Sequence, residues 1–154
     1  MWEEAKKAIA ASNADSSVYI GCDSIRYRLN GLWMAKYSTV VIVHMSSRHG
    51  CKIFYNSEAI RDYGSGVEGL KQRLLTEVGY AVEAATEVLD VLDGRPLEVH
   101  LDLNPDPMHK SNVAVKEAVG WVLGMGMTPV IKPDGWAATH AADHCVRSKG
   151  FAHG

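Results

Sequence analysis

The stretch Glu98-Val-His-Leu-Asp-Leu-Asn-Pro-Asp-Pro-Met-His-Lys-Ser-Asn112 is the part of the sequence that best decides the fold. It begins with Val99, Leu101 and Leu103 alternating with polar residues, a pattern typical of a strand with two different faces. The Asn-Pro-Asp-Pro that follows ends the strand, because proline lacks a ladder donor and restricts the residue before it. Asp102 is therefore expected at the carboxyl end of a strand, the edge where open α/β sheets bind ligands.

Around this strand, the sequence predicts three strands followed by alternating helices and strands. A short helix at 3–12 comes first, and Asn30-Gly31 is a hairpin-turn dipeptide between the first two strands. This order favours a mixed sheet with helices on its faces. The predicted elements after the first helix are strands 18–24, 33–45 and 51–55, helix 67–92, strand 99–103, helix 113–123, strand 128–132 and helix 136–147.

Composition indicates one folded domain over residues 1–154, with 1–15 as a lead-in and 150–154 as a frayed tail. Apolar residues make up 47% of the chain and charged residues 22%, which excludes a disordered protein. The formal net charge is −2, so no strong basic field announces nucleic acid, and any such binding must come from a local patch.

The three cysteines, Cys22, Cys51 and Cys145, are odd in number and lack metal-type spacing. This favours unpaired thiols in a reducing compartment. No apolar run approaches the length of a membrane span. We therefore expect a cytoplasmic domain without a membrane partner.

Asp23 ends the first predicted strand as Asp102 ends the fourth. If these strands lie side by side and parallel, the two carboxylates meet at one edge, about 5 Å apart. Carboxylates that close suit a hard cation such as Mg²⁺, often together with substrate phosphates. The competing interpretation is two independent surface aspartates.

The helices offer further carboxylates and a histidine pair. Glu77 lies on the flank of the aliphatic stripe of helix 67–92, while Glu68 is further round but nearer the helix start. His140 and His144 have the i, i+4 spacing of a helical zinc site, but lack the glutamate beside the first histidine. In the same helix Asp143 points largely away from the small buried face.

Four stretches together resemble the YkuK-type family of ribonuclease H-like proteins, over residues 18–147. They are Ile20-Gly-Cys-Asp-Ser24, the segment from Val99 to Ser111, Val119-Gly-Trp-Val-Leu-Gly-Met-Gly126, and Lys132-Pro-Asp-Gly-Trp-Ala-Ala-Thr-His-Ala-Ala-Asp-His144. The resemblance implies an α/β fold with a five-stranded sheet of order 3-2-1-4-5, strand 2 antiparallel, and helices on both faces.

The resemblance also implies a cluster of four acidic residues that acts as catalytic and metal-binding site. By position these are Asp23, Glu77 (or Glu68), Asp102 and Asp143, with Asp134 as the competitor of Asp143. The implied reaction is phosphodiester hydrolysis with two ions, Mg²⁺ or Mn²⁺. His140 and His144 could assist near the phosphate.

The sequence thus favours a metal-dependent nuclease, with RNA or an RNA–DNA hybrid preferred over duplex DNA. The first alternative is a non-catalytic ribonuclease H-like module that binds nucleic acid or a protein, and the second is phosphoryl chemistry on a small nucleotide. We find no basic handle or aromatic cluster of the kind that grips a duplex. A modest phosphate patch is expected from Lys110, Lys132 and Arg147.

Overall fold

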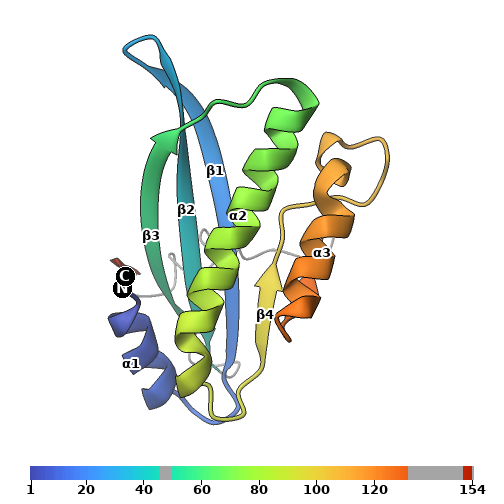
Figure 1. Cartoon of the computed structure of the whole chain (residues 1–154). Helices are drawn as coiled ribbons and strands as arrows, with labels where there is room; N and C mark the ends of the chain where they lie inside the picture. The colour runs from blue at the N-terminus through green and yellow to red at the C-terminus, as the bar shows by residue number, and fades with distance from the viewer. Residues whose placement is uncertain (46–49, 132–150, 154) are drawn as a thin grey trace.

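The structure is a computed structural model that describes residues 1–45, 50–131 and 151–153. The chain begins with a short helix, continues through a three-stranded meander, and then alternates helices with short strands (Figure 1). The elements are α1 (Glu3–Ala11), β1 (Ser17–Leu29), β2 (Leu32–His44), β3 (Cys51–Arg61), α2 (Gly66–Val88), η1 (Leu89–Val91), β4 (Leu97–His100), η2 (Lys110–Ala114), α3 (Val115–Gly124), β5 (Thr128–Val130) and β6 (Phe151–His153).

The strands form one mixed sheet in the order β5-β4-β1-β2-β3-β6. β2 runs antiparallel to both β1 and β3, whereas β4 is parallel to β1 and to β5. The predicted α/β fold with strand order 3-2-1-4-5 and an antiparallel second strand is therefore confirmed. The prediction of a frayed tail is wrong for Phe151–His153, because this segment pairs in parallel with Ile53–Tyr55 at the edge of β3.

One face of the sheet packs against α1, α2 and α3, which lie in front of it in Figure 1. The apolar stripe predicted for α2 is buried there through residues such as Val78 and Ala85, against β1 and β2 residues such as Ile20 and Val41. Each fully buried aliphatic side chain stabilises the fold by roughly 1.5–3 kcal/mol relative to an exposed one. This packing fixes α2 over the middle of β1.

The opposite face carries a second cluster of buried residues, Ile42, Cys51 and Ile53. Cys51 is disulfide-bonded, so the prediction of unpaired thiols is wrong for this residue. The spacing of cysteines along a chain does not reveal which distant segments the fold brings together. Cys22 is free and buried, as predicted, and Cys145 lies outside the described residues.

Several strands differ in length from their predictions. β1 continues to Leu29 and β3 to Arg61, since both pair with β2 along their polar ends. The predicted turn at Asn30-Gly31 is confirmed, with φ of 52° and 77°. β4 ends at His100, before the predicted end at 103, although Leu101 still donates its N–H to the Val130 carbonyl.

The predicted helix at 136–147 lies outside the described residues. Within the described part of the chain, every helix is too short or too polar to cross a membrane.

Candidate acidic site

The site is built where β1 and β4 part. In the described part of the chain these strands pair from Val18↔Leu97 to Gly21↔His100, after which β1 continues and β4 ends. Asp23 and Asp102 each lie two residues beyond the last pair, at the same level and in the same phase of their strands. The predicted side-by-side, parallel arrangement of the two strands is confirmed. A strand end that separates from its neighbour in this way leaves room for a ligand between side chains of both.

Glu77 reaches this level from α2. Its side chain is only 7% exposed, although glutamate is almost never buried unless it is paired. The Ser24 hydroxyl donates a hydrogen bond of 2.5 Å to Glu77 Oε2. A small enclosed space lies between Glu77 on α2 and Asp102 beyond β4, with Cys22 and Leu103 also in its lining. The structure therefore gathers Asp23, Glu77 and Asp102 from three separate elements.

The electrostatics of Glu77 reflect this surrounding. Burial raises the pKa of Glu77 to about 8, and the negative charges of Asp23 and Asp102 act in the same direction. The hydrogen bond from Ser24 and the charge of Arg73 oppose the rise. At neutral pH the Glu77 carboxyl is mostly protonated, and a positive charge at this point would favour its ionised form.

Short-range hydrogen bonds hold the two aspartate segments in place. Ser24 donates its backbone N–H to Asp23 Oδ1 at 2.9 Å. In the loop that follows Asp102, Asn104 donates its N–H to Ser111 Oγ and its side-chain oxygen accepts from the N–H of Asp106, both at 2.9 Å. The Asn-Pro-Asp-Pro stretch is thus an ordered turn that carries Asp102 away from the sheet.

Two residues beside the site were not predicted from the sequence. Ser24 follows Asp23 directly, and strand alternation places it on the face toward α2, so its position was in principle readable. His100 is only 1% exposed; it lies 5.1 Å from the Tyr19 ring and 2.9 Å from Glu98 Oε1. Burial lowers the pKa of His100, although Glu98 opposes this, so the imidazole is neutral at pH 7.

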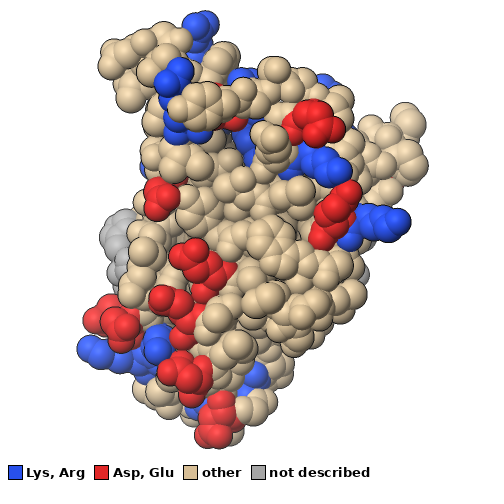
Figure 2. Space-filling view, viewed as in Figure 1, with Lys and Arg blue, Asp and Glu red and all other residues tan. Residues whose placement is uncertain are grey.

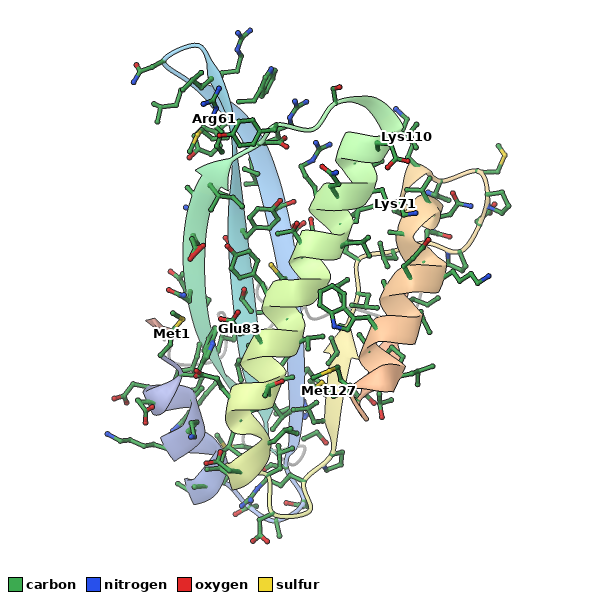
Figure 3. The ribbon with its side chains drawn as sticks, in the orientation of Figure 1. Met1, Arg61, Lys71, Glu83, Lys110 and Met127 are labelled. Atoms are coloured by element: carbon green, nitrogen blue, oxygen red, sulfur yellow. The ribbon has the colours of Figure 1, made fainter. Side chains whose placement is uncertain are left out.

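The remaining predicted site residues separate into two groups. Glu68 lies exposed in the first turn of α2, so Glu77 rather than Glu68 is the α2 glutamate near the two aspartates. Lys110 is exposed in η2, toward the upper end of the molecule near the start of α2 (Figure 3). The other predicted site residues lie outside the described residues: Lys132, Asp134, His140, Asp143, His144 and Arg147.

The oxygen donors of the three gathered carboxylates suit Mg²⁺ or Mn²⁺ in their chemistry. Within the described residues, however, no three His, Cys, Asp or Glu side chains come close enough to form a group that could hold an ion. Asp23, Glu77 and Asp102 are therefore near enough to influence one another's charge, but they do not by themselves form a complete ligand set.

A second feature corrects the sequence analysis. Arg26 and Arg28 lie over the ring of Trp33, and Arg61 lies over the ring of Tyr63. We call these five residues the hairpin-end cluster. The prediction that the chain lacks a basic and aromatic cluster is wrong, because strand pairing brings together residues that are scattered between positions 26 and 63.

The comparison with protein families identifies one relationship. A family model described as "Ribonuclease H-like" matches residues 1–147. No curated protein and no solved structure matches the chain.

Proposed function

This chain belongs to the ribonuclease H-like family, and from that premise we propose that it is a metal-dependent nuclease that hydrolyses phosphodiester bonds at the acidic site. The observation that carries the proposal is Glu77, a buried carboxyl whose pKa is raised to about 8, first by burial and then by Asp23 and Asp102. Strongly shifted carboxyls of this kind gather at functional sites more often than elsewhere.

In the proposed reaction, the carboxylates of Asp23 and Asp102 bind Mg²⁺ or Mn²⁺, and Glu77 and Asp143 complete the shell. Two such ions, when bound, activate a water and stabilise the leaving oxygen. Glu77 releases its proton on binding, and the Ser24 hydroxyl continues to donate to Oε2 and so orients the carboxylate. His140 or His144 assists near the phosphate. RNA or an RNA–DNA hybrid remains the preferred substrate.

The test is cleavage of labelled single-stranded RNA, RNA–DNA hybrid, duplex DNA and a four-way junction, with Mg²⁺, Mn²⁺ or EDTA. We expect metal-dependent cutting that Asp23→Asn and Asp102→Asn each reduce by roughly a hundredfold or more, because each removes a charged ligand. Glu77→Gln is expected to reduce cutting as well. Glu83→Gln is the matched control, since Glu83 is an exposed glutamate of the same helix.

Cutting that survives Asp23→Asn and Asp102→Asn would contradict the proposal. So would a wild-type protein that cuts none of the substrates and binds no Mn²⁺ by calorimetry. In that case a non-catalytic module that binds nucleic acid or a protein becomes the better account of the fold.

A further inference from the structure

We infer that the hairpin-end cluster binds a single-stranded segment of nucleic acid that continues from the acidic site. The inference deepens the proposed function and rests on it for the class of ligand. It concerns Arg26, Arg28, Trp33, Arg61 and Tyr63, which lie away from the three gathered carboxylates.

The end of the β1–β2 hairpin projects past the rest of the sheet. β4 accompanies β1 only as far as Gly21, and β1 and β2 then continue as paired strands to the turn after Leu29. In Figure 1 this end rises beyond α2, and α1 and α3 lie at a distance from it. Its side chains are therefore not needed to fill the core described above.

Large apolar and aromatic side chains are nevertheless exposed at this end. Trp33 is 39% exposed and Tyr63 is 81% exposed, and several aliphatic side chains around them are exposed as well. Contiguous exposed apolar surface of this kind marks an interaction site more often than not. The aliphatic members are Ile25, Leu29, Leu32 and Ile60.

The charge at this end selects the partner. The guanidinium carbons of Arg26 and Arg28 lie 4.1 Å and 5.3 Å from the centre of the Trp33 ring, and that of Arg61 lies 4.8 Å from the Tyr63 ring. Figure 2 shows Lys and Arg at the upper, hairpin end of this face and a group of Asp and Glu over its lower left. The positive end suits phosphate, although the whole chain has a formal net charge of −2.

Arginines combined with exposed rings are the surface that single strands require. Guanidinium groups bind the backbone phosphates, and aromatic rings stack on unpaired bases without regard to sequence. Paired bases in a duplex do not offer their faces for such stacking. We therefore infer a single strand as the ligand rather than a duplex.

A buried ion-pair network connects this end to the acidic site. Asp62 Oδ2 accepts from Arg26 Nε at 2.6 Å and from Arg73 at 3.2 Å, while Gly64 donates its N–H to Asp62 Oδ1 at 3.1 Å. Burial alone would raise the pKa of Asp62, but these bonds and charges hold it below its usual range. Arg73 is one helical turn from Glu77 on α2, so Asp62 ties the hairpin to the helix that carries Glu77.

Strand alternation then gives the path. Ser24, which donates to Glu77, shares the α2-facing side of β1 with Arg26 and Arg28. From Ser24 to Arg28 the strand rises by about 13 Å. A strand of nucleic acid that leaves the acidic site along β1 would therefore meet Arg26, Arg28 and the Trp33 ring in turn.

The experiment measures binding of fluorescein-labelled oligo(U) and oligo(dT) by anisotropy in EDTA, so that no cleavage is required. We expect Trp33→Ala to weaken binding roughly 5–100-fold, the range for loss of one stacked base. Trp33→Phe should restore most of the affinity, because it keeps a ring. Arg28→Ala should weaken binding and lower the salt slope of log Kd by roughly 0.7, as expected for one phosphate contact with a single strand.

The chain offers matched controls. Trp121 on α3 is 41% exposed, close to the value for Trp33, and Lys116 is an exposed cation on the same helix. Trp121→Ala and Lys116→Ala should bind the oligonucleotides as the wild type does. Circular dichroism and thermal melting establish that every variant is folded.

Equal affinities of the wild type, Trp33→Ala and Arg28→Ala would overturn the inference, as would a wild type that binds neither oligonucleotide. Sedimentation tests the other possible occupant. If Trp33→Ala converts a dimer into a monomer without changing oligonucleotide affinity, this end is an interface between copies and the inference fails. Loss of cleavage alone would contradict the proposed function while leaving this binding result intact, so the two failures are distinguishable.

Discussion

Glu77 is a residue whose ionisation and position are in conflict. Its unperturbed pKa is 4.5, whereas the folded protein holds it at about 8 because the side chain is buried beside Asp23 and Asp102. Between these two pH values the folded state keeps a proton that the unfolded chain has already lost. The free energy of unfolding must therefore fall as the pH rises through this window.

The first prediction in this Discussion follows from that linkage. Glu77→Gln should stabilise the protein by roughly 2–4 kcal/mol above about pH 8, since each unit of pKa shift corresponds to about 1.4 kcal/mol. Below about pH 4.5 the two proteins should be nearly equal, because Glu77 is then protonated in both the folded and the unfolded state. Urea denaturation at both pH values measures the difference.

Glu83→Gln, at an exposed position of α2, serves as the control and should change stability little at either pH. A stabilisation by Glu77→Gln that does not depend on pH would show that the linkage argument is wrong. A gain in stability together with a loss of cleavage would be the trade-off expected of a functional carboxyl.

Residue-level reasoning from the sequence succeeded for Asp23 and Asp102 and was less decisive for Glu77. Both aspartates end alternating strands, so strand order alone was enough to predict that they meet. Helix angle left Glu77 and Glu68 open, because both lie off the centre of the apolar stripe. Only the level at which α2 crosses β1 separates the two glutamates, and that level depends on packing between distant segments.

Among the elements, the start of α2 depends on a close contact between two glycines. A side-chain carbon added to Gly69 would lie 2.5 Å from the backbone carbon of Gly64, a distance that real side chains do not tolerate. Gly64 also accepts a hydrogen bond from Arg26, and its N–H donates to Asp62. The contact therefore fixes the loop that presents Asp62 to the two arginines.

We predict that Gly69→Ala destabilises the protein by about 1–3 kcal/mol, through the backbone shift that the added methyl group requires. Gly120→Ala is the matched comparison, because Gly120 also lies within a helix and an added carbon there meets no described atom within 4 Å. Alanine at that position should stabilise by up to about 1 kcal/mol through its higher helix propensity. Chemical denaturation that moved both variants in the same direction would contradict the close-contact argument.

At this scale the sequence predicted the existence of most elements but not the full length of β1 and β3. The apolar alternation of β1 stops after Cys22, and the following Asp-Ser-Ile-Arg-Tyr-Arg has no clear pattern. Those residues are in a strand because β2 pairs with them up to Leu29, and such pairing leaves no mark on composition. The hairpin-end cluster was missed for the same reason.

Over the whole molecule, local stability should be uneven. The centre of the sheet is buried under α2, with Val18, Ile20 and Val41 fully enclosed, whereas the hairpin end is exposed. Segments with few buried contacts open with lower free energies than the core does. The hairpin end should therefore open independently of the sheet centre.

Hydrogen exchange followed by mass spectrometry tests this prediction. Amides of residues 18–22 and 41–43 should exchange by global unfolding, and those of residues 27–33 should exchange several orders of magnitude faster. Adding oligo(dT) should slow exchange at residues 27–33 without changing the sheet centre. Uniform protection along the full length of β1 would be inconsistent with a separately opening hairpin end.

The register of β1 also bears on the order in which the protein folds. β1, β2 and β3 follow one another along the chain, so their pairing closes only short loops, whereas Val18 meets Leu97 only after the whole of α2 has been spanned. Contacts between segments so far apart in sequence form slowly, because the entropy of closing the loop is lost before they can compensate for it. During folding the chain therefore gains its hairpin early and brings Asp102 to Asp23 late, so a chain whose carboxyl-terminal half has yet to dock has no assembled acidic site.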